Sequence, residues 1–122
     1  MAVKLIASDL DGTLLRNDKS ISEETGKALE KAREAGIYFV PSTGRALEAV
    51  PVEVMALPGV EYVITSNGAA VYSGSGGTRI YESLVPAEAV DALLEISMPE
   101  NMTIAVSYTH LRAHETSQDL VC

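Results

Sequence analysis

The sequence predicts an α/β fold built on a parallel sheet. Three apolar runs have the length of buried strands, and a segment with helical spacing separates the first from the second; the runs are residues 3–8, 37–41 and 60–65. A strand–helix–strand order favours parallel pairing through a right-handed crossover. Because ligands bind outside the carboxyl ends of the strands in such sheets, the residues that follow each run are candidates for a site.

A helix is expected between the first two strands. Ser20 or Ser22 provides its N-cap, and Ser20 with Glu23 has the spacing of a capping box. Gly36 ends the helix as a C′ glycine. One stripe of this helix is apolar and is expected to face the sheet: Ala28, Leu29, Ala32 and Ala35.

The later elements are expected to be short. Residues 47–57 fit a helix that is interrupted or restarted at Pro51. Asn67-Gly68 between apolar runs is a strong turn signal, which favours a structural role for Asn67 and leaves substrate contact open. The remaining segments fit a β-hairpin around a glycine-rich tip, an amphipathic helix and a further strand: residues 69–72 with 78–81, residues 86–96 and residues 102–105.

Two aspartates stand at the end of the first strand, within the string Asp9-Leu10-Asp11-Gly12-Thr13. Because side chains alternate along a strand, Asp9 and Asp11 project the same way. Two neighbouring carboxylates repel unless a cation lies between them, and a hard divalent cation with oxygen ligands, above all Mg²⁺, is the usual solution. A strand-end turn with two solvated acids is the plainer alternative.

An anion site is expected at the end of the second strand, where Ser42-Thr43-Gly44-Arg45 follows. The Thr43 hydroxyl can donate to a phosphate oxygen, and Gly44 lets a backbone N–H come close. The helix that follows adds its positive end. A plain helix cap explains the same four residues when they are considered alone.

The composition indicates a globular protein with a formal net charge of −8 over 122 residues. This charge argues against nucleic acid or an anionic membrane surface as a partner. No signal peptide or membrane span is expected, and the single cysteine, Cys122, cannot support a disulfide framework. A cytoplasmic location is therefore expected, and the oligomeric state stays open.

Three motifs resemble the haloacid dehalogenase (HAD) superfamily of phosphotransferases, specifically its Cof-type class IIB sugar-phosphatase branch. They are DLDGTLL at 9–15, the apolar run with STGR at 37–45, and ITSNGAAVY at 64–72. The resemblance implies a Rossmann-like core with helices on both faces of the sheet. It also implies that residues 1–84 are the N-terminal part of this core and residues 85–105 the start of an inserted α/β cap domain.

The resemblance implies a role for each matching residue. Asp9 would be the nucleophile that forms an aspartyl-phosphate, and Asp11 the general acid and then the general base. Asp9 and the backbone carbonyl of Asp11 would hold Mg²⁺. The phosphoryl oxygens would bind the Leu10 and Gly44 N–H groups and the Thr43 hydroxyl, and further substrate contacts would come from Arg45 and Asn67.

Two parts of the family's site have no counterpart in this chain. Members use a lysine that neutralises the phosphate and a later acidic loop of the G-D-x-x-N-D kind that completes the Mg²⁺ site. Glu115 and Asp119 lack that context. We therefore expect an incomplete, inactive N-terminal fragment of a phosphatase of small phosphorylated metabolites.

Residues 106–122 resemble a translated sequencing adapter. Val106 to Thr116 matches the transposase end used in library preparation, and Asp119 to Cys122 matches its continuation after an index. Under this interpretation the tail is not native protein. Otherwise His110 and His114, four residues apart, suggest a metal-binding module.

Two further functions are alternatives to the phosphatase. A non-enzymatic phospho-acceptor of the receiver type needs an aspartate at the end of the third strand, where this chain has Thr65-Ser66-Asn67. A phosphomutase of the same superfamily uses the same aspartyl-phosphate and stays open, because substrate choice lies in the cap.

Overall fold

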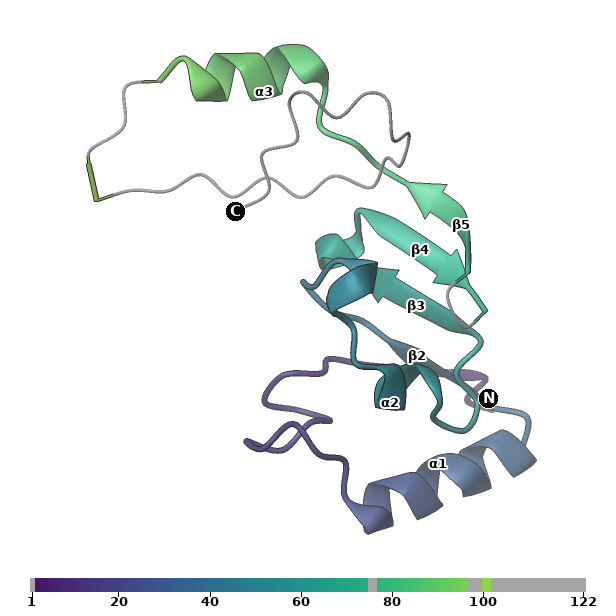
Figure 1. The fold of residues 1–122 in the computed structure, drawn as a ribbon. Coiled ribbons are helices and arrows are strands. Elements are labelled where there is room, and N and C mark those ends of the chain that lie inside the picture. The colour runs from purple at the N-terminus through teal and green to yellow at the C-terminus, as the bar shows by residue number, and fades with distance from the viewer. Residues whose placement is uncertain (1, 75–76, 97–99, 102–122) are drawn as a thin grey trace. The chain divides into compact units, whose positions relative to one another are not determined.

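The structure is a computed structural model that describes residues 2–74, 77–96 and 100–101 (Figure 1). The chain divides between Glu82 and Ser83 into two compact units. This division falls close to the expected domain boundary after residue 84. The assignment of the second unit to a cap domain stays a prediction.

The first unit contains a β-sheet whose first three strands run parallel, as predicted. Strand β1 (Leu5–Ser8) pairs with β2 (Tyr38–Pro41), and Leu5 stands opposite Tyr38. Strand β2 is joined on its other side to the β3 region (Tyr62–Thr65) by parallel bridges, Phe39 with Val60 and Ser42 with Ile64. The three strands therefore end at the same edge of the sheet.

The sheet continues through two antiparallel strands. Strand β4 (Ala70–Ser73) pairs with β3, and β5 (Thr78–Glu82) pairs with β4. The Asn-Gly turn and the hairpin expected from the sequence are both confirmed. A β-bulge between Val71 and Tyr72 shifts the register of the outer pair.

Helix α1 (Glu23–Glu34) has the predicted termini and uses the second of the two predicted cap residues. Ser22, and not Ser20, is the N-cap, and its side chain accepts a hydrogen bond from the Thr25 backbone N–H at 3.1 Å. Gly36 follows the helix with a φ of 74°, as expected of a C′ glycine. The capping-box prediction for Ser20 with Glu23 was wrong because the helix begins one residue after Ser22.

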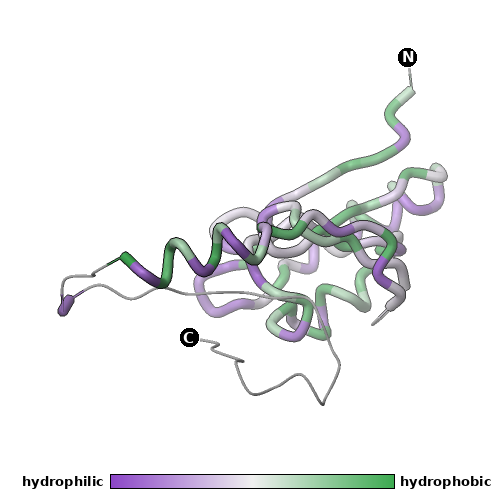
Figure 2. The backbone as a smooth tube through the Cα atoms, turned by 90° about the horizontal axis from the view of Figure 1, so that it is seen from above, coloured by the Kyte–Doolittle hydropathy of each residue, from purple (hydrophilic) through white to green (hydrophobic). Residues whose placement is uncertain are grey.

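Two predictions of burial were wrong. Strand β1 was expected to be buried, yet Leu5 is 52% and Ile6 38% exposed. Among the described strands, β1 has a pairing partner on one side only. Figure 2 shows this mostly hydrophobic segment next to the N-terminus, at the edge of the first unit. In α1, only Leu29 of the predicted stripe is buried, whereas Ala28 and Ala35 are exposed. Among the strands, α1 lies chiefly against β2, which covers only part of the stripe.

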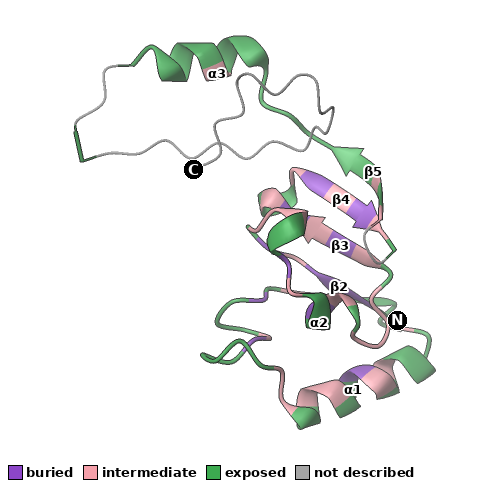
Figure 3. Ribbon diagram, in the orientation of Figure 1, coloured by how far each residue is buried: buried purple, intermediate pink, exposed green. Residues whose placement is uncertain are grey.

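The buried core lies where the loop after β1 and the segment after β2 meet the later strands (Figure 3). The segment expected to be one interrupted helix forms a 3₁₀ turn, η1 (Leu47–Ala49), and a single helical turn, α2 (Val52–Met55), with Pro51 as the N-cap of α2. The core residues are Leu10, Leu15, Val50, Val54, Val63, Ala70 and Tyr72.

The second unit contains helix α3 (Ala87–Leu94), which begins after Pro86 as predicted. Its residues are exposed apart from the half-buried Val90. The predicted strand at 102–105 and the tail at 106–122 lie outside the described residues. No helix in the described part of the chain is long and apolar enough to cross a membrane.

Candidate active site

Three loops meet at the carboxyl ends of β1, β2 and β3, and backbone hydrogen bonds tie them together. The Ser42 N–H donates to the Ser8 carbonyl at 2.8 Å, and the Thr43 N–H donates to the Ile64 carbonyl at 3.0 Å. The pairing with both neighbouring strands therefore continues past the end of β2, through Ser42 and Thr43. It fixes the position of the polar residues that follow.

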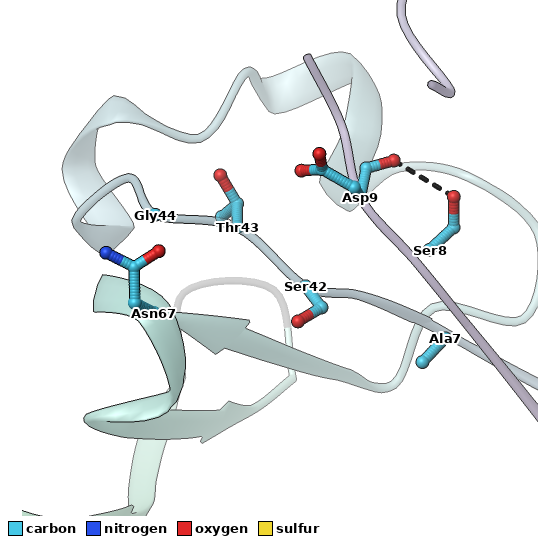
Figure 4. A pocket seen from close by; sticks show the side chains of 7 residues that line it. All are labelled: Ala7, Ser8, Asp9, Ser42, Thr43, Gly44 and Asn67. Atoms are coloured by element: carbon cyan, nitrogen blue, oxygen red, sulfur yellow. Dashed lines mark hydrogen bonds between the residues drawn. The ribbon is translucent and has the colours of Figure 1, made fainter. Parts of the chain in front are cut away.

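These loops line an open pocket of about 500 Å³ (Figure 4). A volume of this size suits a small-molecule ligand. The structure brings four of the predicted site residues together here: Asp9, Thr43, Gly44 and Asn67. The complete lining is Ala7, Ser8, Asp9, Ser42, Thr43, Gly44 and Asn67.

Asp9 is the acidic residue of the pocket lining, and its backbone position is fixed by the neighbouring leucine. The Leu10 side chain is fully buried, which anchors the turn in the core. The Leu10 N–H donates to Asp9 Oδ1 at 2.7 Å. Its binding of a phosphoryl oxygen stays a prediction. The second carboxylate oxygen, Oδ2, has no hydrogen-bond partner among the described residues. The carboxylate is thus oriented through one oxygen and available through the other.

Thr43 presents a hydroxyl to the same space as the Asp9 carboxylate (Figure 4). Thr43 is 5% exposed, so its side chain is held by packing. Its Oγ1 accepts a hydrogen bond from the Arg45 backbone N–H at 3.1 Å. Because the hydroxyl acts there as an acceptor, its proton remains available for a ligand oxygen.

Asn67 lies against Gly44 and has an unusual backbone conformation. It belongs to the 3₁₀ turn η2 (Ser66–Gly68), where Ser66 and Asn67 have φ values of 50° and 55°. This conformation costs free energy for residues other than glycine. It is held by two hydrogen bonds to the Thr43–Arg45 loop, Ser66 N–H to the Arg45 carbonyl at 2.8 Å and Asn67 N–H to the Thr43 carbonyl at 3.1 Å.

The close approach of the Asn67 side chain limits the space for a side chain at residue 44. A Cβ at Gly44 would lie 2.9 Å from Asn67 Oδ1, closer than real Cβ contacts allow. We expect Gly44→Ala to destabilise the fold by about 1 kcal/mol, because the Asn67 side chain has to move aside. Removing that amide should relieve the clash, so Gly44→Ala and Asn67→Ala should couple favourably by about 1 kcal/mol in a denaturant double-mutant cycle.

The matched control for this cycle is Gly26→Ala in α1. No atom lies within 4 Å of a Cβ at Gly26. Alanine there should stabilise the helix by about 0.5–1 kcal/mol. Strict additivity of Gly44→Ala and Asn67→Ala would show that the two residues do not touch in solution.

Asp11 and Arg45 pair with each other beside the pocket instead of lining it. Arg45 Nε donates to Asp11 Oδ2 at 2.9 Å and Arg45 Nη2 donates to Asp11 Oδ1 at 2.8 Å. Lys19 Nζ lies 2.8 Å from the same Oδ1. Hydrogen bonds from Arg45 and then Lys19 hold the pKa of Asp11 well below its usual range. Asp11 is therefore ionised here. The prediction from strand alternation that Asp9 and Asp11 face the same way was wrong, because Asp9 lines the pocket and Asp11 does not.

Lys19 is the residue of this cluster that the sequence analysis missed. It lies ten residues after Asp9, in a loop with no strand or helix pattern. A local signal was present, because Asp18 and Ser20 flank it and such residues favour tight turns. His110, His114 and Cys122 lie outside the described residues, and the described residues hold no group of three histidine, cysteine or acidic side chains arranged to bind a metal.

Comparison with known proteins identifies the family. The family model of the haloacid dehalogenase-like hydrolases matches residues 6–117. The chain belongs to this family. The resemblance inferred from the three motifs is confirmed, and the Rossmann-like α/β fold of the HAD phosphatases is confirmed with it.

Several HAD relatives are phosphatases. The chain is 40% identical over 73 residues to the 5-amino-6-(5-phospho-D-ribitylamino)uracil phosphatase YcsE of Bacillus subtilis. The aligned segment covers 60% of this chain and 29% of that protein. It is 35% identical over 91 residues to the HMP-PP phosphatase of Klebsiella pneumoniae, covering 75% of this chain and 33% of that one.

Solved structures of HAD phosphatases have a similar fold. A HAD subclass IIB sugar phosphatase aligns with a TM-score of 0.66 and 32% identity, covering 75% of this chain and 35% of that chain. A HAD phosphatase from Bacteroides thetaiotaomicron aligns with a TM-score of 0.68 and 30% identity, covering 76% and 34%. The chain thus spans about a third of the length of the relatives that it matches.

Proposed function

We propose that the protein to which this region belongs is a Mg²⁺-dependent phosphatase of small phosphorylated metabolites, sugar phosphates among them. The observation that carries the proposal is the pocket at the strand ends. There the Asp9 carboxylate, with Oδ2 available, faces the same space as the Thr43 hydroxyl and the Gly44 backbone. Membership of the HAD family and the phosphatase activities named for its relatives support the same reaction class.

Each step of the proposed reaction uses a residue placed above. Asp9 Oδ2 attacks phosphorus and the bond from phosphorus to the alcohol oxygen breaks, which gives an aspartyl-phosphate and the free alcohol. Asp11, which Arg45 and Lys19 hold here as a carboxylate beside the pocket, would first have to leave these contacts and take up a proton from water. It would then give this proton to the departing oxygen and take one back from the water that hydrolyses the aspartyl-phosphate. The Thr43 hydroxyl and the Gly44 N–H donate to the phosphoryl oxygens. Asn67, beside Gly44, contacts the substrate.

The donor chemistry of the site fits Mg²⁺. The donors are the exposed Asp9 carboxylate and the Asp11 backbone carbonyl, which are hard oxygen ligands. When bound, Mg²⁺ offsets the charge of the phosphate and orients it. Two protein ligands leave the rest of the shell to water, to substrate and to residues beyond this region.

The first test is phosphate release by the full-length protein. We expect turnover of p-nitrophenyl phosphate and of sugar phosphates, a loss of at least about a hundredfold on chelation with EDTA, and recovery on addition of Mg²⁺. A phosphodiester serves as the control substrate and should not be hydrolysed. Turnover that persists unchanged in EDTA would contradict the metal requirement, and no turnover with any monoester would contradict the proposed function.

We also propose that residues 106–122 derive from a sequencing adapter and that the native chain continues differently after Ala105. The match of Val106–Thr116 and Asp119–Cys122 to the adapter supports this. Sequencing the source DNA across the Ala105 codon tests the proposal and supplies the full-length gene. A source gene that encodes Val106–Cys122 and then stops would contradict it and would make His110 and His114 candidates again.

A further inference from the structure

The N–H of Gly44 is a backbone donor that the parallel sheet leaves without an acceptor. Two residues earlier, the Ser42 N–H donates to the Ser8 carbonyl at the end of β1, at 2.8 Å. The next bond of an evenly spaced parallel ladder would join the Gly44 N–H to the Leu10 carbonyl. That carbonyl instead accepts hydrogen bonds within its own turn, the shorter of them from the Leu15 N–H at 2.8 Å. The Gly44 N–H therefore has no hydrogen-bond partner among the described residues.

The direction of the Gly44 N–H is fixed from the opposite side, by Asn67. The Asn67 N–H donates to the Thr43 carbonyl at 3.1 Å. The peptide between Thr43 and Gly44 is trans, so its N–H points away from its carbonyl oxygen. Because β2 lies between β1 and β3, a carbonyl held on the β3 side turns the Gly44 N–H towards the β1 side, where Asp9 lies. Gly44 is exposed there, and it lines the pocket together with Asp9 (Figure 4).

Asn67 reaches the Thr43 carbonyl because of its left-handed backbone. Ser66 and Asn67 both have positive φ, and their successive N–H groups both donate to the loop after β2. In an extended strand, successive N–H groups point to opposite sides, and one of the two contacts would be lost. Glycine adopts a positive φ freely and asparagine tolerates it, whereas a β-branched residue there is strongly disfavoured.

We propose that Asn67 is a positioning residue that acts through its backbone: its N–H holds the Thr43 carbonyl, and this directs the Gly44 N–H at an oxygen of the phosphoryl group. The inference rests on the proposed function, which places the phosphoryl group in this pocket. Without the Asn67 hydrogen bond, the peptide before Gly44 can rotate and turn its donor away, because glycine restrains it little. A donor that is fixed in advance stabilises charge better than one that has to be oriented on binding.

The test measures inorganic phosphate as a competitive inhibitor of the full-length protein with Mg²⁺. Phosphate is the probe because it has no organic part for the Asn67 amide to contact. Asn67→Gly removes the side chain and keeps the backbone conformation, whereas Asn67→Ala and Asn67→Val disfavour that conformation increasingly. We expect the Ki of phosphate to stay within about twofold for Asn67→Gly, and to rise about threefold for Asn67→Ala and about tenfold for Asn67→Val.

A matched control applies the same backbone strain away from the pocket. Gly36, which follows α1, has a φ of 74°, and no atom lies within 4 Å of a Cβ there. Gly36→Ala should lower the thermal unfolding temperature at least as much as Asn67→Ala does, and should leave the Ki of phosphate unchanged. A rise in Ki for Gly36→Ala equal to that for Asn67→Ala would show that the effect follows stability, which would overturn the inference.

The amide proton resonance of Gly44 gives a direct readout. It is observed in full-length protein labelled with ¹⁵N-glycine and is assigned by its loss in Gly44→Ala. We expect saturating phosphate to move this resonance downfield in the unmodified protein and in Asn67→Gly, and to move it less in Asn67→Val. If Asn67→Val does not fold, Asn67→Ala serves for both measurements.

Failure of the inference and failure of the proposed function give different results. Equal weakening of phosphate binding by Asn67→Gly and Asn67→Val would show that the side chain and not the backbone matters. That result, an unchanged Ki in every variant, or a Gly44 resonance that phosphate does not move would overturn the inference and leave the phosphatase proposal intact. Absence of turnover of any monoester by the unmodified full-length protein would overturn both.

Discussion

Asp9→Asn is expected to abolish phosphate release by the full-length protein, with a loss of at least about a thousandfold. The amide oxygen is neutral and cannot form a stable covalent link to phosphorus. The fold should be unchanged, because Asn Oδ1 can accept the Leu10 N–H as Asp9 Oδ1 does at 2.7 Å. Initial rates with p-nitrophenyl phosphate, together with thermal unfolding, measure the two effects separately.

The control for Asp9→Asn is Asp91→Asn, an exposed aspartate in α3, which should leave the rate unchanged. Rapid acid quench during turnover should also show a phosphoryl group on the peptide that contains Asp9, and on no peptide of the Asp9→Asn variant. A variant that keeps a tenth of the rate, or a phosphoryl group on another residue, would show that Asp9 is not the nucleophile.

Local sequence signals predicted the parts of the fold that local chemistry decides. The C′ glycine Gly36, the interruption at Pro51 and the Asn67-Gly68 turn each act over a few residues, and each was found where the sequence placed it. The exposure of Leu5 and Ile6 depends instead on what lies beside β1, which is set by residues distant in the sequence. No pattern within residues 3–8 carries that information.

The same distinction applies to the site. Asp9, Thr43, Gly44 and Asn67 were expected to meet because the ends of parallel strands share one edge, and the structure places them around one pocket. The pairing of Asp11 with Arg45 joins residues 34 positions apart, and spacing alone did not reveal it. Because Arg45 and Lys19 neutralise Asp11, repulsion between the Asp9 and Asp11 carboxylates does not require a metal between their side chains.

The 122-residue chain by itself is expected to show no turnover of p-nitrophenyl phosphate with Mg²⁺. A phosphate ester carries negative charge and has to approach the Asp9 carboxylate. The residues that line the pocket include no lysine or arginine. The nearby cations Lys19 and Arg45 are both bound to Asp11. Charge that would offset the phosphate is therefore lacking in the described part of the site.

The decisive comparison is between this chain and the full-length protein at equal concentration, in the same buffer and with the same Mg²⁺. Full-length protein should release phosphate steadily, and the 122-residue chain should not exceed the background of its own Asp9→Asn variant. Measurable turnover by the chain that Asp9→Asn removes would contradict the expectation. It would mean that Asp9, Thr43 and the Mg²⁺ held at their loops suffice for the reaction without a further lysine or acidic loop.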